Sequence, residues 1–231
     1  VSTARLDEIA ENYITGHGGR PSFKGYLGFP RSICASVNDA VVHGVPDGRV
    51  LLQEGDIVGI DLGVEVDGFH ADIAATFPVG EITEQAARLL RVTREACLRG
   101  VAAAVPGNHV GDISLAVQRH VEGAGFSVVR DLVGHGIGRS VHQEPRVPNY
   151  HEGEAGPELK PGMALAIEPM VNAGDWRVRV SKDRWTFRTA DGSLSAHFEH
   201  TIIVRRSRPL VVTRWPAVRW AKSSRRAAVG G

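Results

Sequence analysis

Several acidic and imidazole side chains stand singly inside apolar or glycine-rich stretches of the sequence. Glu168 and Glu199 each interrupt a segment that otherwise has the composition of a core strand, and His135 lies between Gly134 and Gly136. Ionised carboxylates are almost never fully buried without a partner. These side chains therefore indicate a functional site formed by buried ionisable groups.

A predicted β-hairpin over residues 56–72 brings two more carboxylates together. The hydrophobic period drops to two there, and the Asp-Gly pair at positions 67 and 68 is typical of a two-residue turn. The register that follows places Asp72 opposite Gly63 and makes Asp61 its diagonal neighbour on the same face. Because Gly63 has no side chain, we expect that face to be open around Asp61.

Convergence of these acids requires either protons or a cation. Two carboxylates about 4 Å apart repel each other by about 4 kcal/mol at an effective dielectric constant near 20. If Glu168 and Glu199 reach the face of the hairpin, some of the acids are protonated or a cation lies among them. Four acids and one imidazole can supply two metal ions with bridging and terminal ligands, as in two-metal hydrolases.

Three helices are predicted to accompany these segments, with strands and loops elsewhere. They cover residues 4–15, a segment that follows a Thr83 N-cap and stops at Pro106-Gly107, and residues 112–123. The first is expected to be amphipathic, with Leu6, Ile9, Ala10 and Tyr13 at helical spacing.

The composition is that of one globular domain. The chain has 231 residues, of which 42% are hydrophobic and 23% charged. No run approaches the roughly 18 uncharged apolar residues of a membrane helix, and the first residues lack the pattern of a signal peptide, so we expect a cytoplasmic protein without a membrane partner. Cys34 and Cys97 are too few for a disulfide framework and are expected to be thiols.

The charge is distributed unevenly along the chain. Residues 205–231 carry eight basic side chains and no acid, whereas residues 1–204 carry 19 basic and 26 acidic side chains, a net charge of −7. We expect a catalytic domain over residues 1–212 and a basic, disordered tail over residues 213–231. Such a tail could bind a phosphate-rich surface without reading a nucleic-acid sequence.

Taken together, the motifs resemble those of methionine aminopeptidases of the shorter, bacterial-type class. The similarity runs from about Leu6 to about Val212. It includes the hairpin of Asp61 and Asp72. The other motifs are Ser36-Val37-Asn38-Asp39, His43-Gly44-Val45-Pro46, Gly134-His135-Gly136-Ile137-Gly138, His142-Gln143-Glu144-Pro145, Ile167-Glu168-Pro169-Met170 and Glu199-His200-Thr201.

The resemblance implies the α+β pita-bread fold, a curved antiparallel sheet covered by helices. Members of the family carry one more long helix ahead of the segment that begins at Leu6, so the expected fold has an N-terminal helix missing from this sequence. The resemblance also implies two divalent metal ions. Their five ligands are Asp61, Asp72, His135, Glu168 and Glu199. Carboxylate and imidazole ligands suit Co, Mn, Fe(II) and Zn alike, so the sequence leaves the metal open.

The resemblance further implies roles for three side chains in hydrolysis. Glu168 would accept the proton of the attacking water, His142 would donate to the carbonyl oxygen, and His43 would hydrogen-bond the scissile amide. A side-chain pocket with aromatic and soft walls, able to hold a thioether, is also implied. It is formed by Phe23, Tyr26, Phe29, Cys34 and Trp185.

Two positions depart from the family's usual residues. Val141 stands where a bulky aromatic is common, which implies a looser pocket, and His197 stands where glutamine is common. Strand alternation puts His197 on the face of Glu199, two residues away, so its ring is expected to hydrogen-bond a ligand carboxylate.

The implied activity is removal of the N-terminal methionine from nascent polypeptides whose second residue is small. The basic tail would then meet the ribosome surface. One alternative is a proline-directed peptidase of the same fold, although such enzymes usually add a large N-terminal domain for which this chain has no room. The other is a binding protein that has lost catalysis, which loss of metal ligands would indicate. All five ligand positions are filled by suitable residues.

Overall fold

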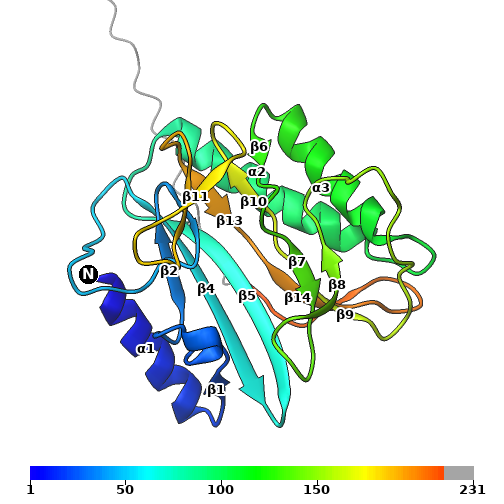
Figure 1. The fold of residues 1–231 in the computed structure, drawn as a ribbon, viewed down its shortest axis with the longest axis horizontal. Helices are drawn as coiled ribbons and strands as arrows, with labels where there is room; N and C mark the ends of the chain where they lie inside the picture. Colours follow the sequence, from blue (N-terminus) through cyan, green and yellow to red (C-terminus); the bar gives the residue numbers. More distant parts are fainter. Residues whose placement is uncertain (216–231) are drawn as a thin grey trace, which may run out of the picture.

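Strands lie between outer helices in the computed structural model, which describes residues 1–215 (Figure 1). The helical elements are α1 (Thr3–Gly16), the short 3-10 turn η1 (Tyr26–Gly28), α2 (Glu84–Ala103) and α3 (Val110–Gly123). The strands are β1 (Arg20–Pro21), β2 (Cys34–Val37), β3 (Ala40–Val42), β4 (Ile57–Val66), β5 (Phe69–Pro78), β6 (Ser127–Val128), β7 (Gly134–Gly136), β8 (Gln143–Val147), β9 (Ala164–Ile167), β10 (Met170–Asn172), β11 (Val178–Val180), β12 (Phe187–Thr189), β13 (Ser195–His197), β14 (His200–Ile203) and β15 (Leu210–Val211).

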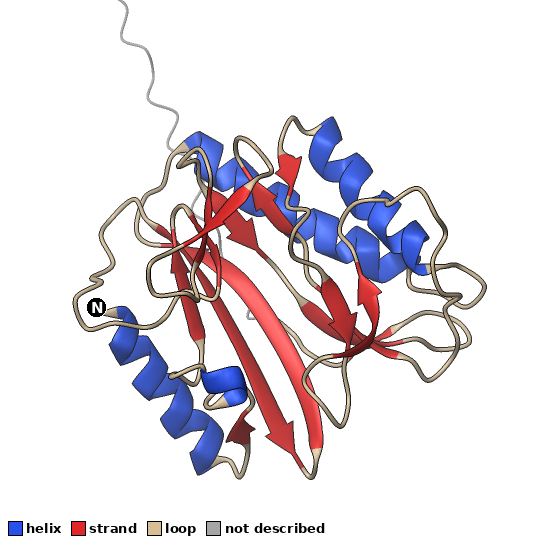
Figure 2. Ribbon diagram, viewed as in Figure 1, coloured by secondary structure: helices blue, strands red, loops and turns tan. Residues whose placement is uncertain are grey.

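The strands pair antiparallel in four sheets. The long hairpin of β4 and β5 is extended by β1 and β2, both of which pair with β4. A five-stranded sheet has the order β15-β14-β9-β7-β8, and two three-stranded sheets have the orders β13-β10-β6 and β11-β12-β3. Figure 2 shows α1 beside the hairpin sheet, and the pair α2 and α3 on the side of the molecule that holds the five-stranded sheet. The α+β prediction agrees with this arrangement.

The predicted hairpin register is confirmed. Val66 pairs with Phe69 and Gly63 pairs with Asp72, while both strands continue to Pro78 and Ile57. The two turn residues at positions 67 and 68 have φ values of 51° and 79°. Positive φ at both central residues is the geometry of the type I′ turn that an Asp-Gly pair favours.

Two of the predicted helices, α2 and α3, pack against each other in the main hydrophobic core of the molecule. Thr83 is the N-cap of α2, since its side chain accepts a hydrogen bond from the backbone N–H of Ala86. The helix α3 begins at Val110, two residues earlier than predicted, because the Asp112 carboxylate lies in the first turn and accepts from the backbone N–H of His109 at 2.7 Å. Such an acid in the first turn stabilises the helix N-terminus.

The amphipathic helix predicted over residues 4–15 is present as α1, but its apolar side is largely exposed. Ile9 is 50% exposed and Tyr13 67% exposed, whereas the buried residues are Thr3, Asp7 and Ile14. The burial of a carboxylate there is explained by backbone donors that reach it from another segment. The apolar side of α1 instead borders a groove along the outer face of β4.

The chain contacts the domain beyond the predicted boundary at residue 212. Thr213 accepts from the backbone N–H of Thr201, and the indole N–H of Trp215 lies 2.8 Å from the carbonyl oxygen of Ala74 and 3.0 Å from that of Glu199. Residues 216–231, the greater part of the predicted basic tail, lie outside the described residues. Within residues 1–215, no helix is long and apolar enough to cross a membrane.

Candidate metal centre and substrate pocket

Asp61 and Asp72 lie on the same hairpin face and line one pocket. The backbone N–H of Asp72 donates to the Thr201 hydroxyl at 2.8 Å, which ties this part of β5 to β14. One carboxylate oxygen of Asp72 accepts from the backbone N–H of Ile73, whereas Oδ1 of Asp61 is buried without a hydrogen-bond partner. The hairpin therefore delivers two carboxylates, one of which lacks the bonds a buried acid needs.

The expectation that Gly63 leaves this face open is wrong. A Cβ atom at Gly63 would lie 2.8 Å from Cβ of Ser22 and 2.9 Å from the Phe23 ring. The segment after α1 packs directly on the glycine, and the backbone N–H of Ser22 donates to the Gly63 carbonyl at 2.8 Å. The glycine thus makes room for a pocket wall rather than for solvent.

His135 is supplied by β7, which lies between β8 and β9. The two flanking glycines allow this close approach, since a Cβ atom at Gly134 would overlap the carbonyl oxygen of Ala166 and one at Gly136 that of Glu144. The Nδ1 atom of His135 lies 2.9 Å from the Gly136 carbonyl oxygen. Donation from Nδ1 leaves Nε2 as a lone-pair donor toward the pocket, as a metal ligand requires.

Glu168 and Glu199 lie at breaks between strands. Glu168 falls between β9 and β10, and Glu199 between β13 and β14. The backbone N–H of Glu199 donates to the Ala74 carbonyl of β5 at 2.8 Å, while the Asn149 side chain donates to the Glu168 carbonyl at 3.1 Å. These bonds hold the two acids where the strand pairing changes, so that their side chains turn into the pocket.

All five predicted ligands meet at one place. One ligand atom each of Asp72, His135 and Glu199 lie within 4.8 Å of one another. Oε1 of Glu168 lies 3.3 Å from Nε2 of His135, and Asp61 lines the same cavity. Residues that are up to 138 positions apart in the sequence therefore form a single cluster.

Burial makes this cluster electrostatically costly. Burial raises the pKa of Asp72 to about 7. Burial, reinforced by repulsion from neighbouring acids, raises the pKa values of Asp61, Glu168 and Glu199 well above their usual range. Each acid would be stabilised by a cation among them, because an opposite charge favours the ionised form.

The nearby imidazoles do not supply that cation. Burial, with a smaller effect from His142, lowers the pKa of His135 to about 4. Burial likewise lowers the pKa of His197 to about 3, and its Nε2 lies 3.6 Å from Oε2 of Glu168. Both rings are therefore neutral near pH 7. The ring of His197 approaches Glu168 and not its strand neighbour Glu199. At 3.6 Å this contact is not the hydrogen bond that was expected.

The donor set fits a divalent metal ion. It combines carboxylate oxygens and one neutral imidazole nitrogen, the ligands that such ions take in hydrolases. Two of the carboxylate oxygens, Oδ1 of Asp61 and Oε1 of Glu199, are buried without any hydrogen-bond partner. Unsatisfied buried acceptors of this kind are expected where a cation binds.

The acid cluster and the predicted side-chain pocket share one cavity of about 140 Å³ that is open to solvent. It is lined by all of the predicted pocket residues, namely Phe23, Tyr26, Phe29, Cys34 and Trp185. The Phe29 and Trp185 rings pack edge to face at 5.2 Å. Val141 is buried in the same apolar cluster, so this position contributes packing to the pocket wall.

His142 and His43 also line the cavity. Nδ1 of His142 lies 2.9 Å from the Tyr26 hydroxyl, and its ring packs on His135 with centroids 4.3 Å apart. Burial lowers the pKa of His43 to about 4, so this ring is neutral. The two imidazoles predicted to contact a substrate are thus within the same space as the acids.

Two features of the cavity were not predicted. Leu27 lines it although the side chain is 81% exposed, and its φ of 48° turns the chain at the cavity mouth. The contact between Tyr26 and His142 joins residues 116 positions apart. The glycines at 25 and 28 indicate a turn around Leu27, but nothing in the local sequence indicates the partner of the Tyr26 hydroxyl.

Comparisons with known proteins agree with this geometry. Residues 1–206 match the model of metallopeptidase family M24. The chain is 53% identical over 213 residues to a methionine aminopeptidase of Clostridium perfringens, covering 92% of this chain and 85% of that protein. It is 50% identical over 214 residues to methionine aminopeptidase 1 of Bacillus subtilis, covering 93% of this chain and 86% of that protein. The crystal structure of methionine aminopeptidase from Rickettsia prowazekii superposes with a TM-score of 0.89 at 43% identity, covering 91% of this chain and 85% of that one. The predicted pita-bread fold is confirmed.

Binding of a divalent metal is expected to release protons and to strengthen as the pH rises from about 6 to about 8. The raised pKa values mean that the metal-free acids hold protons that the cation must displace, whereas neutral His135 contributes none. Calorimetric titration with Mn²⁺ in two buffers of different ionisation enthalpy measures the release. Asp72→Asn is the comparison, because a neutral amide cannot offset a divalent charge and binding should be lost. A heat independent of buffer, with affinity flat across this range, would contradict the expectation.

Proposed function

The chain belongs to metallopeptidase family M24, and we propose that it is a metal-dependent aminopeptidase that removes methionine from polypeptides whose second residue is small. The observation that carries this proposal is the union of two features in one cavity. The acid and imidazole cluster lies beside an apolar wall with aromatic rings and the Cys34 thiol. Such a wall suits a thioether, and the cluster suits hydrolysis of the bond next to it.

Two divalent cations would be held by the four acids and His135, with Mn, Fe(II), Co and Zn all compatible with these ligands. When bound, they would supply Lewis acidity toward a water nucleophile and toward the scissile carbonyl. A second cation would also offer a partner for the free amine of the substrate, which accounts for attack at the chain end. The use of divalent metal follows from the family, and the number of ions is part of this proposal.

Glu168 is the proposed proton acceptor from the attacking water. Its carboxylate lies within the acid cluster, with Oε1 3.3 Å from Nε2 of His135, and a cation beside it would keep it ionised and able to accept a proton. His142 is the proposed donor to the oxygen on which negative charge develops. With the Tyr26 hydroxyl donating to Nδ1, the proton of the neutral ring lies on Nε2 and is available to that oxygen. Neutral His43 would hydrogen-bond the scissile amide.

The two alternative functions receive less support. Identities of 50% and 53% to methionine aminopeptidases do not favour a proline-directed peptidase of the same fold. A binding protein without activity would not need five convergent ligands, two of which have buried oxygens without hydrogen-bond partners.

Peptide hydrolysis tests the proposal directly. Metal-stripped protein refilled with Mn²⁺, Fe(II), Co²⁺ or Zn²⁺ is expected to cleave Met-Gly, Met-Ala and Met-Pro tripeptides. Leu-initiated tripeptides and Xaa-Pro peptides that lack methionine are the controls and should be cleaved slowly or not at all. The metal-stripped protein should be inactive. Faster cleavage of the Xaa-Pro peptides, or equal cleavage with and without metal, would exclude the proposed function.

His142→Ala is expected to lower kcat by about 10² to 10³ while the metal content stays unchanged, because the substitution removes a donor to the developing negative charge. Steady-state kinetics and metal analysis on the same preparation measure both quantities. Asp72→Asn is the comparison that should lose metal and activity together. Metal loss in His142→Ala would instead identify this imidazole as a ligand.

We further propose a cytoplasmic site of action at the ribosome surface. Arg205, Arg206, Arg208 and Arg214 are exposed basic side chains at the C-terminal end of the described residues, and four more basic residues follow in the sequence. The remainder of the chain carries a net charge of −7 and would be repelled by phosphate. A basic end can offset this repulsion through counterion release.

Deletion of residues 217–231 is expected to leave tripeptide kinetics unchanged and to weaken co-sedimentation with ribosomes at low salt. The deleted segment contains four of the eight basic groups, so the salt dependence should become shallower. Full-length protein in the same salt series is the reference. Equal co-sedimentation of the two proteins at every salt concentration would rule out the attachment.

A further inference from the structure

One wall of the cavity is a short loop between β1 and β2, residues 22–33. It contributes Phe23, Tyr26, Leu27 and Phe29 to the lining. The backbone N–H of Gly25 donates to the Phe29 carbonyl at 2.8 Å, and that of Tyr26 to the Phe23 carbonyl at 2.9 Å. The loop therefore has an internal shape of its own, but these bonds do not fix it relative to the rest of the domain.

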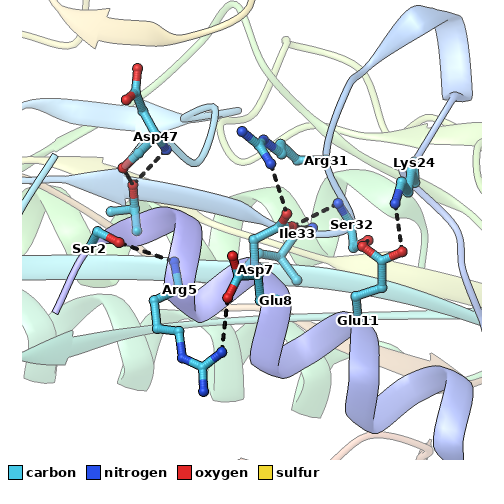
Figure 3. A network of polar contacts seen from close by, with 11 residues as sticks. Ser2, Arg5, Asp7, Glu8, Glu11, Lys24, Arg31, Ser32, Ile33 and Asp47 are labelled. Atoms are coloured by element: carbon cyan, nitrogen blue, oxygen red, sulfur yellow. Dashed lines mark hydrogen bonds and ion pairs between the residues drawn. The ribbon is translucent and has the colours of Figure 1, made fainter. Parts of the chain in front are cut away.

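Both ends of the loop are fastened to α1 (Figure 3). At the first end, the Lys24 ammonium lies 2.5 Å from Oε1 of Glu11. At the second end, the backbone N–H groups of Ser32 and Ile33 donate to Oδ1 of Asp7 at 2.8 and 3.1 Å. The Ser32 hydroxyl also donates to Oε2 of Glu11 at 2.9 Å. Two acids one helical turn apart thus hold the two ends of the pocket loop.

Asp7 is the more constrained of these two acids. Asp7 is 3% exposed, and the guanidinium of Arg31, which is partly exposed, lies 3.7 Å from the second carboxylate oxygen. A buried carboxylate is costly unless it is hydrogen-bonded, and two backbone N–H donors to one ionised oxygen are strong bonds. Figure 3 shows Glu8 on another side of the helix, paired with Arg5 at 2.9 Å.

The loop also reaches the chemistry of the site. The Tyr26 hydroxyl lies 2.9 Å from Nδ1 of His142, and the Phe29 ring packs on Trp185 across the cavity. A displacement of the loop would move the apolar wall and the hydroxyl together. Because a misplacement of about 1 Å can cost on the order of 10²-fold in rate, the anchorage of this loop matters to catalysis.

We propose that Asp7 is a positioning residue for the substrate pocket. Its carboxylate fixes the return of residues 22–33 onto the sheet, and this sets the wall that selects the methionine side chain. Asp7 touches neither substrate nor metal ligands and acts through the loop. The inference rests on the proposed aminopeptidase function and adds to it the element that determines side-chain selectivity.

The test compares Asp7→Leu, which removes the acceptors at similar size, with Asp7→Asn, which keeps a carbonyl oxygen for the two N–H groups. Asp7→Leu is expected to raise KM for Met-Ala-Ser about tenfold or more and to reduce the preference for methionyl over leucyl peptides, with a smaller change in kcat. Asp7→Asn should stay within about fivefold of the wild-type KM, because a neutral hydrogen bond replaces a charged one.

The matched control is Glu8→Leu on the same helix. Glu8 is exposed and pairs with Arg5 on the same helix, so KM and selectivity should not change. Mn²⁺ affinity of Asp7→Leu, measured by calorimetry, should remain within about twofold of wild type because the metal ligands come from other elements. Unchanged metal binding alongside a changed KM separates a displaced loop from general unfolding.

Glu11→Ala covers the case in which Asp7→Leu does not fold. It removes the anchors of Lys24 and Ser32 from a partly exposed position and should raise KM about two- to fivefold. A folded Asp7→Leu with wild-type KM and selectivity, or a shift matched by Glu8→Leu, would overturn the inference, as would an unchanged KM in Glu11→Ala. If the wild-type protein binds free methionine but cleaves no methionyl peptide, the proposed function fails. The inference is then tested by methionine affinity alone, which should be weaker in Asp7→Leu than in the wild type.

Discussion

The burial of four carboxylates in one cavity, with repulsion among them added, is the constraint on which the rest of the structure depends. Asp61, Asp72, Glu168 and Glu199 are held in one cavity, and each has a pKa above the usual range. Without constraint from the fold, these carboxylate side chains would move apart and be hydrated by solvent. Their convergence requires a framework stiff enough to hold them before a cation arrives, and the free energy of metal binding then includes the repulsion that the cation relieves.

The framework achieves this with backbone hydrogen bonds between sheets. Asp72 is tied to β14 through the Thr201 hydroxyl, and Glu199 to β5 through the Ala74 carbonyl. Trp215 donates at the same junction, close to the carbonyl oxygens of Ala74 and Glu199. These two acids are therefore placed by bonds of their own main chain, which leaves Oε1 of Glu199 without a hydrogen-bond partner. Rigid support of this kind is what a preorganised site requires.

The sequence was sufficient where interactions are local. The register of Asp61 and Asp72 follows from a two-residue turn and from strand alternation, and both hold in the structure. The five predicted ligands were chosen from residue type and motif, and the five residues meet in one cavity. The burial of Asp7 could not be predicted, because the donors that satisfy it come from Ser32 and Ile33, 25 and 26 residues later. Hydrophobic periodicity predicts that such an acid is exposed, because it contains no information about a hydrogen-bond partner far away in the sequence.

The bond between Asp72 and Thr201 closes a span of 129 residues. Joining such distant points costs roughly 4 kcal/mol of chain entropy before any contact in the site offsets it. The candidate ligands extend from Asp61 to Glu199, so the site is complete only after contacts of this sequence separation have formed. The hairpin of Asp61 and Asp72, whose strands are adjacent in the sequence, can form before Glu168 and Glu199 join it. The proposed ability to bind metal therefore arises only with the complete tertiary fold and not with any single segment of the chain.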